Sequence, residues 1–266
     1  MHKTKNIFSA IAVLDFFWNP KRLSFVLLII LFVLIFSSCR KENTNPDQFF
    51  TGKSYFPLKT GNEITYKITK INIDKASAIF DTTIYQIKER VDSIFIDASG
   101  KQAYRIERYY RTDSLAQWVI KDVWSAQVND LNAQKVEENI RYIKLVFPAK
   151  TGQLWDGNAY NDLDEQDYQI VSSNIADTIQ GLAFDSVLTV EQQNESSLIS
   201  KKYAVEKFAN GVGLVYKEIT DLYSQSMIGS GMPIEERVDE GTIFIQEVIG
   251  FSVSSIERTS NPKLRS

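Results

Sequence analysis

The sequence predicts an all-β fold, mainly antiparallel, built either as a sandwich or as an open or partly closed barrel-like sheet. Apolar and polar residues alternate with a period of two through most of the chain after residue 53. The alternating runs are rich in β-branched and aromatic residues, and turn-forming residues separate them. Short strands joined by hairpins form antiparallel sheets, which sets the fold class.

The expected strands follow one another along the chain. The first alternates from Ile64 through Ile68, and then Ile71 and Ile73 continue one step out of phase, so we expect a β-bulge between these two parts. The remaining expected strands lie at 85–91, 104–110, 186–192, 200–209, 213–223 and 242–257.

Two turns and one ambiguous segment complete this assignment. Asn210 and Gly211 stand between two alternating runs, and this pair suits the positive φ angles of a type I′ hairpin. Residues 98–101 are expected to close a second hairpin. The segment 129–140, "NDLNAQKVEENI", is expected to be either a helix or a polar loop.

One hexapeptide occurs twice, as "FPLKTG" at Phe56–Gly61 and "FPAKTG" at Phe147–Gly152. Lys-Thr-Gly is one motif of serine β-lactamases and penicillin-binding proteins, but that chemistry needs an upstream Ser-x-x-Lys, and this pattern occurs only at Ser260–Lys263. In the structural interpretation, proline extends the residue before it and glycine supplies a free φ angle. We therefore expect a turn used twice, with both phenylalanines in the core.

The N-terminus predicts export. Lys21 and Arg22 precede a run of fourteen apolar residues, Leu23 to Phe36, and then Ser37-Ser38-Cys39. Such a run is about 21 Å long as a helix, which is shorter than a membrane span and typical of a signal sequence. "FSSC" resembles the lipobox of bacterial lipoproteins, whose cysteine carries acyl chains such as palmitate. The resemblance implies that Cys39 is lipidated and is the first residue of the mature protein.

The expected organisation is a signal helix and cleavage region at 1–38, a lipid-anchored tether at 39–53, one antiparallel β domain at 54–258 and a tail at 259–266. "YFPLKTGNEITY" at 55–66 and "FANGVGLVYKE" at 208–218 resemble segments of uncharacterised Bacteroidota lipoproteins. This resemblance implies an outer-membrane-anchored envelope protein, facing the periplasm or the cell surface, and it implies no catalytic residues.

The composition excludes several kinds of chemistry. The one histidine, His2, lies in the signal region, so the expected mature chain has neither a histidine triad nor a histidine metal site. The net charge of −3 argues against a nucleic-acid partner. We expect no cofactor and no enzymatic activity, and a hydrolase that uses carboxylates alone remains an alternative.

An acidic segment, "DGNAYNDLDEQD" at 156–167, offers oxygen ligands of the kind that calcium prefers. The spacing does not match an EF-hand, so a solvated acidic loop is the competing interpretation. The candidate calcium ligands are Asp156, Asp162, Asp164 and Asp167.

Aromatic residues and hydroxyl residues give two further hypotheses. Aromatic side chains could line a carbohydrate or lipid pocket, or belong to the core; these are Tyr109, Tyr110, Trp118, Trp124, Trp155 and Tyr160. Five Asp-Ser/Thr pairs resemble the O-glycosylation sequon of Bacteroidota, although such pairs also open strands after turns. The hydroxyl residues are Thr82, Ser93, Ser114, Thr178 and Ser186.

The sequence therefore predicts a non-catalytic envelope protein, held on the membrane through lipidated Cys39, whose β domain binds a small-molecule, lipid, glycan or protein ligand. A structural or assembly component of an outer-membrane complex is the alternative from another class. A concave cavity lined by aromatic side chains would favour the first, and a large exposed apolar patch would favour the second.

Overall fold

The computed structural model describes residues 51–225 and 232–253. The chain divides into two units, Met1–Phe49 and Phe50–Ser266, and all described residues belong to the second. The expected signal sequence, lipidation site, tail and most of the tether lie outside the described residues. Within the described residues, no helix is long and apolar enough to cross a membrane.

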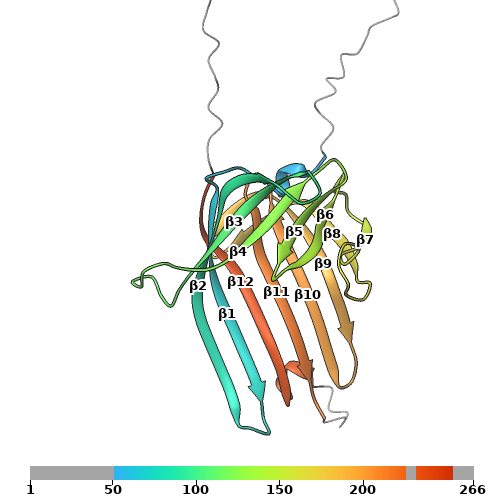
Figure 1. Cartoon of the computed structure of the whole chain (residues 1–266). Helices are drawn as coiled ribbons and strands as arrows, with labels where there is room; N and C mark the ends of the chain where they lie inside the picture. The colour runs from blue at the N-terminus through green and yellow to red at the C-terminus, as the bar shows by residue number, and fades with distance from the viewer. Residues whose placement is uncertain (1–50, 226–231, 254–266) are drawn as a thin grey trace, which may run out of the picture. The chain divides into compact units, whose positions relative to one another are not determined.

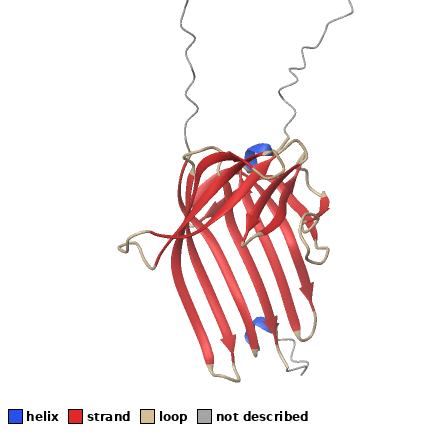
Figure 2. Ribbon diagram, viewed as in Figure 1, coloured by secondary structure: helices blue, strands red, loops and turns tan. Residues whose placement is uncertain are grey.

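A twelve-stranded antiparallel sheet makes up almost all of the described part (Figures 1 and 2). Its order is β6-β5-β4-β3-β2-β1-β12-β11-β10-β9-β8-β7, so sequence neighbours pair except at the edges β6 and β7, and the first strand also pairs with the last. The all-β antiparallel prediction is confirmed. The elements are η2 (Lys53–Tyr55), β1 (Glu63–Asp74), β2 (Ile79–Ile96), β3 (Gln102–Arg111), β4 (Val119–Val128), β5 (Asn132–Glu137), β6 (Ile140–Val146), β7 (Leu154–Asp156), β8 (Asp167–Ile179), β9 (Leu182–Ser196), β10 (Ser200–Ala209), β11 (Gly213–Tyr223), η3 (Ile234–Glu236) and β12 (Glu240–Ser252).

The two edge strands, β6 and β7, nearly close this sheet into a barrel. The N–H of Ile143 in β6 donates to the carbonyl of Gly157, directly after β7, at 2.9 Å. Trp155 in β7 donates from its indole Nε1 to the carbonyl of Ile143, also at 2.9 Å. A Cβ at Gly157 would lie 2.4 Å from the ring of Tyr168, so this close approach requires glycine. The barrel-like sheet is the observed arrangement, and the expected alternative of a sandwich is wrong.

The strand β1 differs in one detail from its prediction. It stays in register with β2 from Glu63 to Asp74, so the bulge expected after Ile68 is absent from this pairing. The irregularity of β1 falls between Thr65 and Tyr66 on the side of β12. By the alternation of the strand, Ile71 and Ile73 lie on the face opposite Ile68. The change of phase therefore marks the point where the apolar residues pass from the inner to the outer face.

The repeated hexapeptide forms part of a cap at one end of the barrel, where Figure 1 shows η2 in blue. Phe56 and Phe147 are buried in the same core cluster. Gly61 and Gly152 have φ angles of 91° and 87°, and their N–H groups donate to strand carbonyls at 2.8 and 2.7 Å. The prediction of a turn used twice is confirmed. Residues 51–53, expected in the tether, also belong to this cap, because the carbonyl of Thr51 accepts from the second hexapeptide at 3.0 Å.

Two clusters of buried apolar side chains hold the domain together. The first includes the capped end of the interior and contains Tyr55, Phe56, Ile106, Ala126, Ala133, Leu145, Phe147, Ala149, Tyr168, Ile170, Leu188, Val190 and Phe208. The second contains Tyr66, Ile68, Ile87, Ile179, Phe184, Val187, Ala209, Val215 and Val248. The hydroxyl of Tyr66 donates to the carbonyl of Leu214 at 3.0 Å, so this buried hydroxyl is satisfied.

Two local predictions need correction. The segment 129–140 is neither a helix nor a loop, because it contains β5 and the turn into β6. Glu138 and Asn139 in that turn have φ angles of 48° and 66°, the combination that a type I′ hairpin requires. The turn at Asn210 and Gly211 does join two paired strands, but among these two residues only Gly211 has a positive φ, so it is not a type I′ turn.

Candidate functional site

The half of the barrel interior away from the cap contains a cavity of about 610 Å³. Along β2, Val91 is hydrogen-bonded to Asn62 in the cap, whereas Ile87 and Tyr85, further along the strand, line the cavity. Strands from all around the sheet contribute to its wall. The lining residues are Ile68, Tyr85, Ile87, Arg108, Lys121, Trp124, Glu137, Glu138, Ile140, Tyr142, Lys144, Gln166, Tyr168, Gln192, Gln193, Ala204, Lys217, Ile219 and Phe244.

One group of charged side chains in this interior is centred on Arg108 of β3, and we call it the Arg108 cluster. The guanidinium of Arg108 donates from Nε to Glu89 at 3.1 Å and from Nη1 to both carboxylate oxygens of Asp122 at 3.0 Å. Lys135 of β5 donates to the other oxygen of Glu89 at 2.8 Å. Strand pairing explains the arrangement, because Glu89, Arg108 and Asp122 are direct partners across β2, β3 and β4.

A second group, the Glu206 cluster, lies on β5, β6, β10 and β11. Oε1 of Glu206 is 2.6 Å from Nζ of Lys144 and 3.2 Å from Nζ of Lys217. The carboxylate of Glu137 reaches the same two lysines at 3.4 and 3.5 Å. The side chain of Glu206 is fully buried and that of Lys144 is 4% exposed, so these charges can remain in the interior only as pairs.

The pKa values of these groups follow from this pairing. Burial raises the pKa of Glu137, but the charges of Lys144 and Lys217 outweigh burial and hold the pKa below its usual range. Burial likewise raises the pKa of Glu89, and Lys135 with Arg108 lowers it overall. For Lys144, burial lowers the pKa and the two carboxylates of its cluster raise it overall. The pairing therefore favours the carboxylate form of Glu89 and Glu137 and the ammonium form of Lys144.

Trp124 of β4 is the main aromatic surface beside the charged groups. The guanidinium carbon of Arg108 lies 3.4 Å from the centroid of the indole ring, and Nζ of Lys135 lies at 4.8 Å. These cation–π contacts hold the ring in place in the wall. Three tyrosines, Tyr85, Tyr142 and Tyr168, add further rings to the same cavity.

Several polar atoms of the cavity wall retain hydrogen-bonding capacity. Among the described residues, the hydroxyls of the three tyrosines and Nη2 of Arg108 have no hydrogen bond to protein. Four fully buried side-chain atoms also lack a hydrogen-bond partner within the described part. Nε2 of Gln192 and Nε1 of Trp124 belong to side chains that line the cavity, whereas Oε2 of Glu206 and Nε of Arg105 do not. The polar groups of the interior therefore do not satisfy all of one another's hydrogen-bonding capacity.

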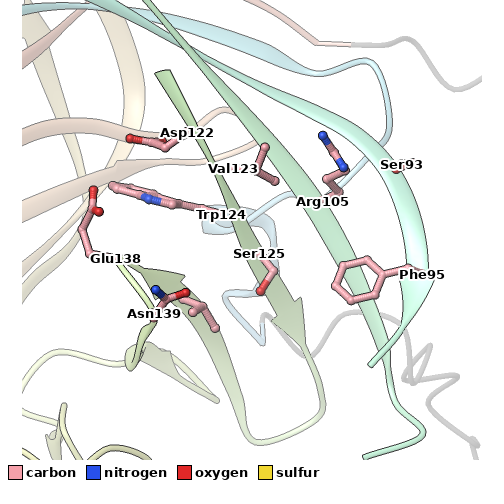
Figure 3. A pocket seen from close by; sticks show the side chains of 10 residues that line it. Ser93, Phe95, Arg105, Asp122, Val123, Trp124, Ser125, Glu138 and Asn139 are labelled. Atoms are coloured by element: carbon pink, nitrogen blue, oxygen red, sulfur yellow. The ribbon is translucent and has the colours of Figure 1, made fainter. Parts of the chain in front are cut away.

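A second hollow, also of about 610 Å³, adjoins the turn between β5 and β6 (Figure 3). In Figure 3, Asp122 and Trp124 project to one side of β4, and Val123 projects to the other. Trp124 and Glu138 line both hollows. The outer hollow is lined by Ser93, Phe95, Arg105, Asp122, Val123, Trp124, Ser125, Val136, Glu138 and Asn139.

The candidate calcium ligands do not converge. Oδ1 of Asp156 accepts backbone hydrogen bonds from Asn158 and Gln166 at 2.9 and 3.0 Å, so this carboxylate shapes the loop. Asp162, Asp164 and Asp167 are exposed. No group of three or more cysteine, histidine or acidic residues in the described ranges is arranged to hold a metal ion.

The five sequon hydroxyls have different environments. Thr82, Ser114 and Thr178 are exposed. Ser93 is partly buried and donates to Asp92 at 2.8 Å. Ser186 is partly buried, donates to the side chain of Asn174 at 2.9 Å and lies 2.8 Å from the hydroxyl of Tyr55. Glycosylation remains a prediction, and the accessible positions are the first three.

Of the six aromatic residues considered from sequence, Trp124 lines the interior cavity. Tyr110 packs on Tyr85 and Trp155 on Tyr168, with ring centroids 5.4 and 5.9 Å apart. The other three lie away from the cavity wall: Tyr109 and Trp118 contact Lys88, and Tyr160 lines a separate outer hollow.

Sequence reasoning missed the charged residues that define the site, although the strands carry a signal for them. Glu206 stands between Ala204 and Phe208 in the alternation of β10, and both neighbours are buried. Arg108 stands between Ile106 and Tyr110 in the same way. A charged residue in phase with the apolar face of a strand predicts a buried charge, which requires a partner.

The fold and the site together define a nearly closed antiparallel barrel with a cap at one end and a charge-paired cavity in the other half. No protein-family model matches the chain, and no curated protein matches it. The structure is similar to a protein from Bacteroides fragilis described as exported and as having a YmcC-like fold, with 14% identity, coverage of 74% of this chain and 98% of the other, and a TM-score of 0.39. It is also similar to a lipoprotein from Parabacteroides distasonis, with 15% identity, coverage of 73% and 97%, and a TM-score of 0.34.

Proposed function

We propose that this chain is a lipid-anchored protein of the bacterial cell envelope whose barrel binds a small ligand in the interior cavity. The observation that carries this proposal is the cavity itself, because its volume of about 610 Å³ lies in the range of about 300–1,000 Å³ typical of ligand sites. A barrel filled only for stability would place apolar side chains there. This barrel instead holds paired charges, aromatic rings and unsatisfied hydroxyls around a space.

The proposal is tested by native mass spectrometry of the mature protein, extracted in mild detergent from the envelope of a Bacteroidota host. We expect a non-covalent mass that is lost on denaturation. Ile219→Trp should abolish it, because Ile219 lines the cavity yet is 39% exposed, so a larger side chain can block the space without disturbing the core. Ile84→Trp is the matched control, because Ile84 is exposed on the opposite face of β2 from Tyr85.

The bound mass in the wild type and in the two variants decides whether the cavity holds a ligand. A mass found in the wild type and in the control but not in Ile219→Trp supports ligand binding in the cavity. Wild-type protein without any bound mass overturns the proposal.

A docking role in an envelope complex is the second candidate, favoured by apolar side chains at the outer hollow. Phe95 and Val123 line that hollow and are 40% and 44% exposed. If docking is the function, crosslinking in intact cells should capture a protein partner that Val123→Asp removes.

The hydrolase alternative gains no support, because a general acid needs a raised pKa, whereas the pKa values of Glu89 and Glu137 are lowered.

A further inference from the structure

The walls of the interior cavity are specific enough to name a class of ligand. We propose that the ligand is a neutral, hydroxyl-rich molecule, a mono- or oligosaccharide, held among the tyrosine hydroxyls and beside Trp124. This inference rests on the proposed function and deepens it. Charge balance, hydrogen-bonding capacity and the pattern of the apolar surface support it.

Charge balance excludes a charged ligand. The Arg108 cluster pairs two cations with two carboxylates, and the Glu206 cluster does the same. At the edge of the cavity, Lys121 also pairs with Asp122 and lies 3.9 Å from Glu138. A ligand with a net charge would add an uncompensated charge to an interior whose own charges are already neutralised, and this is unfavourable at low dielectric.

The free hydrogen-bonding groups match hydroxyls. The hydroxyls of Tyr85, Tyr142 and Tyr168 can each donate and accept, whereas Nη2 of Arg108 can only donate. A ligand hydroxyl can also donate and accept, so it can satisfy any of these groups in either direction. A ligand with several hydroxyls can engage groups on β2, β3, β6 and β8 at once.

The apolar surface of the cavity is interrupted rather than continuous. Ile68, Ile87 and Phe244 provide apolar wall, but Arg108 and Lys144 stand in the same wall. An alkyl chain needs a continuous apolar lining and would leave such groups without water. The carbon-bound face of a sugar ring covers only a small apolar area and packs on an aromatic ring, while its rim of hydroxyls reaches the polar groups.

The test is ligand-observed saturation-transfer NMR on the full mature chain in detergent. The probes are glucose, galactose, mannose, N-acetylglucosamine, maltose and cellobiose as neutral sugars, glucuronate and glucosamine as charged sugars, and palmitate as a lipid. Methyl glycosides of the neutral sugars distinguish a free sugar from the end of a glycan, because their anomeric oxygen is blocked.

We expect at least one neutral sugar to bind at least tenfold more tightly than either charged sugar, and Ile219→Trp, but not Ile84→Trp, to abolish the signal. Tyr142→Phe should weaken binding about fivefold, which corresponds to one hydrogen bond. The fold should tolerate this change, because the hydroxyl bonds no described residue. Tyr203→Phe, on the opposite face of β10 from Ala204, is the matched control and should leave the affinity unchanged.

The outcomes separate this inference from the proposed function. If palmitate or a charged sugar binds and Ile219→Trp abolishes that binding while no neutral sugar binds, the cavity is a ligand site and the inference about ligand class is wrong. If no probe binds in a manner sensitive to Ile219→Trp, the inference also fails, and the co-purified mass decides the proposed function independently.

Discussion

Replacing Glu206 with glutamine removes the carboxylate at the centre of the Glu206 cluster and keeps the shape of the side chain. In the wild type, one oxygen of this fully buried carboxylate pairs with Lys144 and Lys217. Glutamine can still accept from one lysine, but it cannot neutralise either charge. The perturbation therefore isolates the electrostatic contribution of Glu206 to the stability of the barrel.

The expected loss follows from the geometry. Removing one partner of a buried ion pair costs about 3–5 kcal/mol, because the other charge stays buried. Here both lysines keep Glu137 at 3.4 and 3.5 Å, so we expect the lower end, about 3 kcal/mol. For a domain of this size, each kcal/mol lowers Tm by about 2–4 °C, so Tm should fall by about 6–12 °C.

Urea unfolding of the chain from Arg40 onward, followed by tryptophan fluorescence, measures this difference. Glu195→Gln, which neutralises an exposed carboxylate at the end of β9, is the matched control and should change the free energy of unfolding by less than about 0.5 kcal/mol. The double variant Glu206→Gln, Lys144→Met should lose less free energy of unfolding than the two single variants together. The reason is that Lys144→Met removes the ammonium group that Glu206→Gln leaves without its carboxylate. If the free energy of unfolding of Glu206→Gln lies within about 1 kcal/mol of the wild-type value, the charge of Glu206 does not stabilise the barrel.

Three further outcomes are expected. Gly157→Ala brings a methyl group to 2.4 Å from the ring of Tyr168 and should cost about 1–3 kcal/mol in urea unfolding, whereas Gly250→Ala, where the methyl meets nothing within 4 Å, should be nearly neutral; equal effects would contradict the packing argument. The pKa of Glu137 in the folded protein lies below its usual value of 4.5, so its contribution to stability is full above pH 4.5 and is lost as the pH falls below that value. The urea midpoint should therefore be constant from about pH 7 to pH 5.5 and lower at about pH 4 and pH 3. A midpoint unchanged at pH 3 would refute this. Cys39→Ala should move the protein from the membrane to the soluble fraction and abolish acyl labelling. A variant that stays in the membrane fraction and is still acylated would disprove lipidation at Cys39.

The strands in which apolar residues recur with a regular period could be predicted from the sequence. In β10, β11 and β12 apolar residues recur with a period of two, although Glu206 and Lys217 stand on the inner faces. The strands β4 to β8 escape prediction for different reasons. Charged residues stand on the inner faces of β4, β5 and β6, β7 has only three residues, and β8 is irregular at three points of its pairing with β9. Lys135 and Glu137 point into the barrel from β5, so this segment lacks the alternation that predicts a strand, and its composition suits a helix or a polar loop as well.

The site was only partly predictable for a related reason. The sequence shows that Glu206 is in phase with buried neighbours, which indicates a buried charge, but it does not show which cation pairs with it. Lys144 lies 62 positions away in the chain, and only the curvature of the sheet brings the two together across the interior. Trp124 could be named as a candidate pocket residue, whereas its contact with Arg108 depends on the register of β3 and β4.

The pairing of β1 with β12 sets the order of events during folding. Tyr66 and Val248 are partners in the sheet, although one belongs to the first strand to be synthesised and the other to the last. A chain that is synthesised from its N-terminus cannot complete this sheet until its final strand has been delivered. Until then both edges of the growing sheet stay open to pairing with other chains. Closure of the barrel is therefore the last step of folding, and it cannot precede the delivery of β12.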